Sequence, residues 1–293
     1  MTDDWGDNGH FLILGSASRD LIKQSSESLA GRISYKRRNP FQWTEIQLET
    51  TIEEYLSRGG FPRSLLTKSE SDSFEWREDF ITTYLESDLL LLSGFSPGTM
   101  RRLWQMLANL NGQLINFSAL GSALGVSHTT VRNYTELLAA TFMVQLLPPL
   151  LTNTRKRLVK TPKIYLIDPG IANALLGIRN FAELAGHPTM GALWECNVLT
   201  NLGTAFPQCQ FYFYRTNKGE EIDFVIESNN KLFAIESKAS VAPHLSKGTY
   251  TAINDLNPAL TIVIAPVVKG WPINEKTIVA NISEAIQILS EEI

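Results

Sequence analysis

Charged residues near the C-terminal end of the sequence have the types and order that a magnesium-dependent phosphodiesterase site requires. Asp223 lies in a run that alternates polar and apolar residues, and Glu236 and Lys238 close a second such run. Alternation predicts half-buried strands, in which Glu236 and Lys238 share one face. The Asn-rich stretch 227–231 between the runs suits a turn, so we expect a hairpin that brings Asp223 beside Glu236.

This set of side chains matches the needs of metal-assisted phosphate chemistry. Mg²⁺ takes one or two carboxylates, keeps several waters and leaves a coordination site for a phosphate oxygen. Glu195, in the helical pattern 191–202, adds a third carboxylate. We therefore predict Glu195, Asp223 and Glu236 as metal ligands, with Lys238 orienting the attacking water beside the catalytic Asp223 and Glu236. The alternative is a solvated strand face on which Glu236 and Lys238 form a weak surface ion pair.

The order of Glu195, then Asp223, then Glu236-Ser237-Lys238 resembles the PD-(D/E)xK nuclease superfamily. Ile222 stands where the motif usually has proline. The resemblance implies a restriction-endonuclease-like α/β domain over residues 161–293, Mg²⁺ as cofactor and DNA as substrate. Because a fold does not fix function, a noncatalytic DNA-binding or protein-interaction module is the alternative.

Composition limits the classes of protein that this chain can be. Its length of 293 residues predicts two or three domains, and 44% hydrophobic with 19% charged residues is ordinary for a globular protein. The net charge of −4 does not favour nonspecific nucleic-acid binding, so such binding needs a local patch. Cys196 and Cys209 are the only cysteines, which argues against zinc and disulfides and favours a reducing cytoplasm. No apolar run approaches a membrane span, so we expect no membrane partner.

The N-terminal region carries a second resemblance. The apolar run 11–14 predicts a strand buried in a parallel sheet. "FLILGSAS", "SLAGRI" and "NPFQWTEI" resemble the sensor-strand region of AAA-type ATPases from the bacterial and archaeal family with a trailing domain of unknown function. The resemblance implies that Ser16 or Ser18 faces nucleotide phosphates and that Arg32 reaches a phosphate.

The phosphate-binding loop of such ATPases, G-x-x-x-x-G-K-[S/T], does not occur in the sequence. We therefore expect residues 1–47 to be the remnant of an ATPase core in a truncated family member, one that neither binds nor hydrolyses ATP. A strand taken from a parallel sheet lacks neighbours, so this remnant is also a candidate surface for a protein partner or a second copy of the chain.

Residues 48–98 have helical periodicity, interrupted at 58–62 and by a Ser-rich acidic linker at 68–73. "YLSRGGFPRSLL" and "WREDFITTYLESDL" resemble the helical lid of the same ATPase family. An independent helical bundle is the alternative.

Residues 99–160 are predicted to form a winged helix-turn-helix, with helices at 101–111, 117–124 and 128–139 and a strand at 142–147. Ser127 is placed to cap the third helix. In DNA-binding relatives this helix enters the major groove, which would direct four residues toward bases or phosphates: His128, Thr129, Arg132 and Asn133. The alternative is that the winged helix packs against a protein.

The run 155–163 holds five cations and no acid. Arg155, Lys156 and Arg157 are candidate phosphate contacts, and a solvated hairpin is the alternative. Further on, Asp168 is expected to end a strand and cap the helix 171–176. "KTPKIYLIDPGIANALLG" and "GALWECNVLTNL" resemble the trailing domain of the ATPase family.

Together these features predict a multi-domain α/β protein: an ATPase remnant, a helical lid, a winged helix-turn-helix and a nuclease-like α/β domain. The predicted activity is Mg²⁺-dependent hydrolysis of DNA. The alternative is a noncatalytic DNA-binding or protein-interaction module left from an ATPase that has lost ATP binding.

Overall fold

The computed structural model describes residues 34, 36, 38–89, 96–151 and 156–293. The strand expected at 11–14, with Ser16, Ser18 and Arg32, lies outside these residues, as does Arg155. In the described residues no helix is both long enough and apolar enough to cross a membrane.

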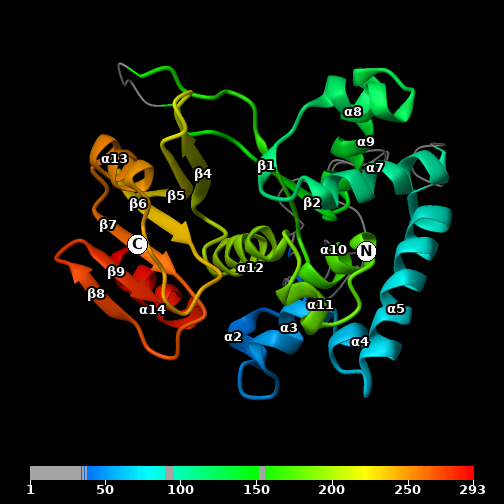
Figure 1. The fold of residues 1–293 in the computed structure, drawn as a ribbon, viewed down its shortest axis with the longest axis horizontal. Helices are drawn as coiled ribbons and strands as arrows, with labels where there is room; N and C mark the ends of the chain where they lie inside the picture. Colours follow the sequence, from blue (N-terminus) through cyan, green and yellow to red (C-terminus); the bar gives the residue numbers. More distant parts are fainter. Residues whose placement is uncertain (1–33, 35, 37, 90–95, 152–155) are drawn as a thin grey trace, which may run out of the picture.

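Figure 1 shows how helices and strands follow one another. The helices are α2 (Trp43–Ile46), α3 (Ile52–Arg58), α4 (Pro62–Leu65), α5 (Glu70–Thr83), the π-helical turn η2 (Tyr84–Asp88), α7 (Pro97–Asn109), α8 (Phe117–Leu124), α9 (His128–Ala140), α10 (Pro169–Leu176), α11 (Phe181–Ala185), α12 (Met190–Ala205), α13 (Lys247–Leu256) and α14 (Ile282–Glu292). The strands are β1 (Gln113–Leu114), β2 (Val144–Leu147), β3 (Lys163–Leu166), β4 (Gln210–Arg215), β5 (Glu221–Ser228), β6 (Lys231–Ser237), β7 (Leu260–Ile264), β8 (Trp271–Asn274) and β9 (Thr277–Ala280).

α3 ends and α4 begins within the interruption that the sequence predicts at 58–62, but the prediction of a linker at 68–73 is wrong. Gly59 ends α3 with a φ of 77°, a conformation that glycine adopts without strain, and Pro62 begins α4. The side chain of Ser69 accepts a hydrogen bond from the Asp72 amide, so α5 already begins at Glu70. Ser and acidic residues therefore act here as a cap and first helical turn.

The three helices expected between residues 99 and 160 are present as α7, α8 and α9. Gly125, with a φ of 70°, ends α8, and Ser127 caps α9 through a hydrogen bond from the Thr130 amide. The strand that follows begins at Val144 rather than at Phe142. Phe142 has a φ of 62° because the chain closes the end of α9 there, and so it cannot join a strand.

A three-stranded antiparallel sheet with the order β1-β3-β2 packs beside these helices. β3 follows the boundary expected at residue 160, yet it pairs with β2 on the other side of that boundary. One cluster of buried apolar side chains also runs from Leu56 through Trp104 and Trp194 to Leu289. The helical segments, this small sheet and the C-terminal part thus share a hydrophobic core.

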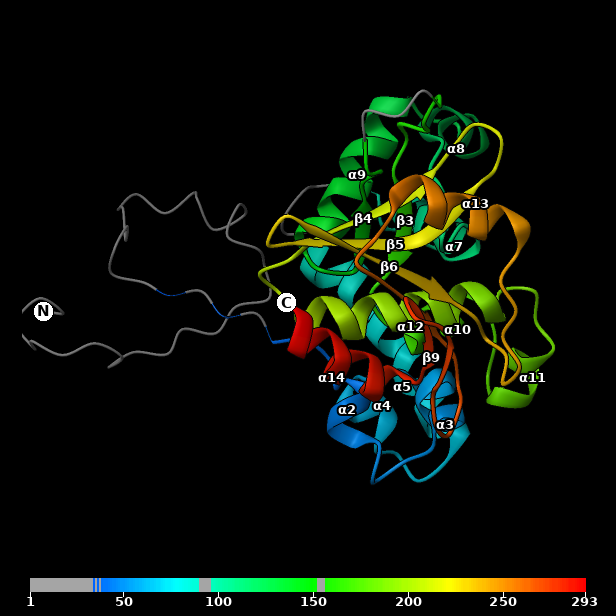
Figure 2. The same cartoon turned by 90° about the vertical axis from the view of Figure 1, so that its left-hand side faces the viewer.

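The larger sheet has the order β4-β5-β6-β7-β9-β8, with an antiparallel β5–β6 hairpin and parallel β6–β7 and β7–β9 pairs. Phe224 and Phe233 pack on the face that α12 and α14 cover, whereas Val225 and Ala234 pack toward α13 (Figure 2). The predicted hairpin is confirmed. Its turn places Asn229 and Asn230 at φ values of 49° and 63°, which asparagine tolerates well.

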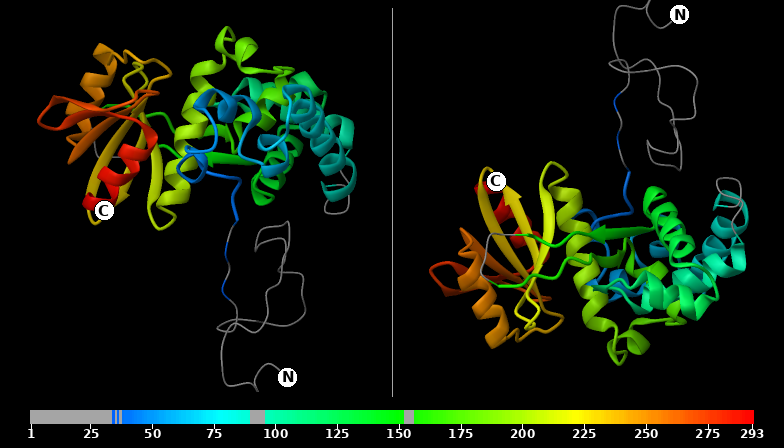
Figure 3. Two further views of the ribbon diagram at one scale, coloured as in Figure 1. Left: turned by 90° about the horizontal axis from the view of Figure 1, so that it is seen from below. Right: turned by 90° about the horizontal axis from the view of Figure 1, so that it is seen from above.

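The described part of the region 1–47 packs on the C-terminal part of the chain. The Trp43 amide donates a 2.8 Å hydrogen bond to the Oδ1 atom of Asn201 on α12. Gln47 accepts a hydrogen bond from Ser283 on α14. Figure 2 shows α2 next to α14. Figure 3 shows the yellow-green helix α12 between the blue N-terminal helices and the large sheet.

Candidate active site

The β5–β6 hairpin brings together Asp223, Glu236 and Lys238. Asp223 lies one position beyond the last paired residues, Phe224 and Ile235, and its Oδ2 atom accepts a 2.8 Å hydrogen bond from the Ser237 amide. The Lys238 Nζ atom lies 2.6 Å from the Oε1 atom of Glu236. The expected placement of Glu236 and Lys238 on one strand face is therefore confirmed.

Helix α12 supplies Glu195, and strand β3 supplies two partners for it. The Lys163 Nζ atom lies 3.1 Å from the Oε1 atom of Glu195, and the Tyr165 hydroxyl donates to that same carboxylate oxygen. Lys163 also lies 2.7 Å from an oxygen of Glu221 and 4.0 Å from an oxygen of Asp223. Lys163 is therefore a buried cation among three carboxylates, and not part of an exposed basic hairpin.

Sequence reasoning missed the roles of Lys163, Tyr165 and Glu221. Lys163 and Tyr165 are two positions apart on β3, so their side chains share a face and reach Glu195 together. A lysine in an otherwise apolar, four-residue strand was the available signal, because such a strand is buried and a buried lysine needs acidic partners.

Glu195, Glu221, Asp223 and Glu236, with Lys163 and Lys238, form what we call the carboxylate cluster. Burial and mutual repulsion raise the pKa values of three of its acids. Burial, reinforced by the charge of Asp223, raises the pKa of Glu195 to about 7 and that of Glu236 to about 8. Burial also raises the pKa of Asp223, against the attraction of Lys163. Burial alone would lower the pKa of Lys163, but Glu195, Asp223 and Glu221 outweigh it and raise that pKa. Near pH 7, Glu236 is therefore mostly protonated, and a bound cation would favour its ionised form.

The environment of Glu236 is asymmetric. Its Oε1 atom accepts hydrogen bonds from Lys238 and, at 3.3 Å, from the Thr249 hydroxyl near the start of α13. Its Oε2 atom is buried without any hydrogen-bond partner. A buried acceptor without a donor is costly, and the side chain is only 5% exposed. This oxygen is therefore a position in the cluster that could take an additional donor or cation.

The three predicted metal ligands do not form a ready-made metal group. In the part of the chain that the structure describes, no three His, Cys, Asp or Glu side chains are grouped so that they could hold an ion. Glu195 is engaged by Lys163 and Tyr165 instead. Asp223 and Glu236 remain as a pair with a free buried oxygen, which fits Mg²⁺ because this ion is often held by one or two carboxylates, waters and substrate phosphate.

The residues expected to contact DNA from α9 are exposed. His128, Thr129, Arg132 and Asn133 all lie on the solvent side of this helix. The Arg132 guanidinium lies 4.7 Å from the centre of the Phe117 ring, which orients it over α8. Figure 1 shows α9 on the other side of the three-stranded sheet from β5 and β6, so these residues form a surface separate from the carboxylate cluster.

The basic run 155–163 divides into residues with different surroundings. The Lys156 Nζ atom lies 2.6 Å from an oxygen of Asp255 and 3.5 Å from one of Glu220, so Lys156 ties this segment to α13 and to the β4–β5 turn. The side chain of Arg157 is exposed, while its carbonyl accepts a hydrogen bond from the Asn217 amide. Of the described predicted contacts in this run, Arg157 is the better placed for a phosphate.

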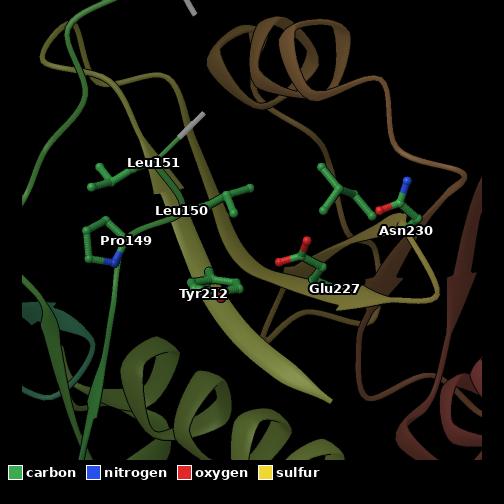
Figure 4. A pocket seen from close by; sticks show the side chains of 7 residues that line it. Pro149, Leu150, Leu151, Tyr212, Glu227 and Asn230 are labelled. Atoms are coloured by element: carbon green, nitrogen blue, oxygen red, sulfur yellow. The ribbon is translucent and has the colours of Figure 1, made fainter. Parts of the chain in front are cut away.

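A shallow pocket of about 530 Å³ lies at the opposite end of the β5–β6 hairpin from Asp223 and Glu236. Figure 4 shows Leu150 and Tyr212 on one side of it and Glu227 on the other. Because Glu227 is four residues along β5 from Asp223, roughly 13 Å at about 3.3 Å per residue, this pocket is not part of the carboxylate cluster.

Comparison with known proteins separates the chain into two matched regions. Residues 49–182 match the model of a domain of unknown function, DUF8612, and residues 190–285 match that of another, DUF4143. The first region includes Lys163, and the second includes Glu195, Asp223, Glu236 and Lys238. The cluster is thus built from both matched regions.

The chain is also similar to two mycobacterial proteins. It is 37% identical over 271 residues to the uncharacterized protein Rv2008c of Mycobacterium tuberculosis and, to the same extent, to the uncharacterized protein Mb2031c of Mycobacterium bovis. The alignment covers 92% of this chain and 61% of each relative, so the chain spans about three fifths of their length. No solved structure matches the chain.

Proposed function

We propose that the cluster on β5, β6 and α12 is a Mg²⁺-dependent phosphodiesterase site that hydrolyses DNA. Asp223 and Glu236 would hold the ion, and Lys238 would act on the attacking water. The observation that carries the proposal is the buried Oε2 atom of Glu236, which has no hydrogen-bond partner and belongs to a carboxyl whose pKa is raised by burial and by the charge of Asp223.

The roles follow from the surroundings of each group. Mg²⁺, when bound, would polarise the phosphate and make a coordinated water more acidic. Lys238 is the most exposed member of the set, with 31% of its side chain accessible, so its ammonium can meet a phosphate or a water. In the reaction class, a water oxygen forms a bond to phosphorus, the ester P–O bond breaks, and the departing oxygen takes up a proton.

DNA as the substrate is supported by a second surface. Four exposed polar side chains on α9 belong to the helix that enters the major groove in winged helix-turn-helix proteins. The order of α7, α8, α9 and the β1-β3-β2 sheet is consistent with such a module.

We also propose that the chain is related to AAA-type ATPases. The segments "YLSRGGFPRSLL" and "WREDFITTYLESDL", which resemble the helical lid of these proteins, support this proposal.

The second candidate is a noncatalytic DNA-binding module. The exposed face of α9 and the exposed Arg157 support it independently of the carboxylates. In this case Lys163 and Lys238 would serve only to neutralise the acids that they contact.

Nicking of supercoiled plasmid DNA separates the two candidates. The wild type should nick the plasmid in the presence of Mg²⁺ or Mn²⁺ and not in EDTA. Lys238→Ala should lose the activity and keep metal binding, because Lys238 acts on water and phosphate. Lys269→Ala, which removes an exposed lysine outside the site, is the matched control and should retain it. DNA binding by the wild type without metal-dependent nicking would favour the noncatalytic module.

A further inference from the structure

Asp223 divides the carboxylate cluster into two halves. Its Oδ1 atom lies 4.0 Å from the Lys163 ammonium, and its Oδ2 atom accepts a 2.8 Å hydrogen bond from the amide of Ser237, the residue after Glu236. On one side Glu236 presents a buried oxygen that has no partner. On the other side Glu195 and Glu221 are already bridged by a cation, the Lys163 ammonium, at 3.1 Å and 2.7 Å.

Such an arrangement resembles a pair of cation positions that share one carboxylate. In two-metal phosphodiesterases the ions lie roughly 3.5–4 Å apart and are held by neighbouring carboxylates. Here the Lys163 Nζ atom lies 4.0 Å from Asp223 and in direct contact with two further acids. Two carboxylates thus contact it directly, which is the number by which Mg²⁺ is often held together with waters.

We infer that Lys163 takes the place of a second divalent cation, so that the site binds a single Mg²⁺ or Mn²⁺ between Asp223 and Glu236. This inference rests on the proposed function. In this inference Lys163 is a positioning residue, because it acts through Glu195 and Glu221, which it contacts.

The surroundings of Lys163 favour a permanent cation over an exchangeable one. Its side chain is 3% exposed and anchored on β3, between β1 and β2. The Tyr165 hydroxyl, from the same strand face, fixes the Glu195 carboxylate. The charges of Glu195 and Glu221 are therefore neutralised by Lys163 at any metal concentration. The charges of Asp223 and Glu236 would be neutralised by the bound ion.

The number of bound ions tests the inference directly. Isothermal titration calorimetry with MnCl₂ on the intact chain, together with elemental analysis after dialysis, should give one ion per wild-type chain. Lys163→Ala should bind two, because three acids then face an open space, and its melting temperature in EDTA should fall and recover with MnCl₂. Lys238→Ala, which removes the lysine paired with Glu236, is the matched control and should bind one ion.

The outcomes separate this inference from the proposed function. Two ions in the wild type overturn the inference whether or not the variant folds, and leave the metal site in place. One ion in both the wild type and a folded Lys163→Ala, without recovery of stability by MnCl₂, also overturns it. No bound ion in the wild type overturns the metal site itself and the inference with it.

Discussion

The backbone N–H of Gly60 donates a 2.7 Å hydrogen bond to the Oδ2 atom of Asp168, across 108 positions of the sequence. The Oδ1 atom of Asp168 accepts a 2.8 Å bond from the Ile171 amide and so caps α10. One buried carboxylate thus joins the loop between α3 and α4 to the helix that follows β3. Arg77, also buried, stabilises this junction by donating to the carbonyls of Ser57 and Gly170.

Because Asp168 is buried at this junction, we predict that the stability of the protein depends on pH. Burial raises the pKa of Asp168 from its ordinary value of 3.8 to about 6 in the folded protein. The folded state therefore holds this proton more tightly, so its contribution to the free energy of unfolding is greatest below pH 4 and is lost as pH rises to about 6. The loss is up to about 3 kcal/mol, at about 1.36 kcal/mol per pKa unit.

Urea unfolding between pH 4.5 and pH 7 measures this contribution. The difference in unfolding free energy between the wild type and Asp168→Asn should change with pH up to about 6 and then level off. Asp79→Asn, at an exposed position, is the control for the loss of one charge. A difference between wild type and Asp168→Asn that is constant over this range would contradict the account of the junction.

Two glycines at the same position of their helices give a matched steric test. Gly170 and Gly191 are each the second residue of a helix, α10 and α12. A Cβ atom at Gly170 would lie 2.2 Å from the Arg58 carbonyl oxygen, whereas one at Gly191 would meet no atom within 4 Å. Gly170→Ala should therefore destabilise the protein by about 1–3 kcal/mol, the usual cost of overpacking.

Gly191→Ala should be neutral or stabilising by up to about 1 kcal/mol, because alanine favours the helix. Thermal unfolding of both variants side by side gives the comparison. Equal melting temperatures would show that α3 and α10 are not packed as closely as described.

The exposed Arg157, in the basic run 155–163, is expected to contact a DNA phosphate. Arg157→Ala should weaken binding to duplexes of any sequence and lower the slope of log K against log salt by about one unit. Lys156→Ala should change the slope less, because Lys156 is held by Asp255. Fluorescence anisotropy over a range of salt concentrations measures both. If Arg157→Ala has the slope of the wild type, the run 155–163 is a solvated surface that does not contact DNA.

The β5–β6 hairpin and its facing residues could be predicted because strand alternation and an Asn-rich turn are local signals. Asp168 as a cap and Ser127 as a cap were predictable for the same reason. The position of Lys163 was not, because it lies in a run of cations and its burial results from packing against α12 and β5. The start of α5 was misplaced because Ser69 and Glu70 suit both a linker and a helix start.

The effect of divalent metal on the melting temperature tests the central claim most directly. A cation that binds only the folded chain stabilises it by about 2.7 kcal/mol at one hundred times its Kd. The wild type and Glu227→Gln, which changes an exposed acid at the far end of β5, should show the same dose-dependent rise with Mg²⁺ or Mn²⁺. Asp223→Asn should show none, although its amide oxygen can still accept the Ser237 hydrogen bond. A wild type without any rise, or an Asp223→Asn protein that rises equally, would contradict the assignment of Asp223 and Glu236 as a metal site.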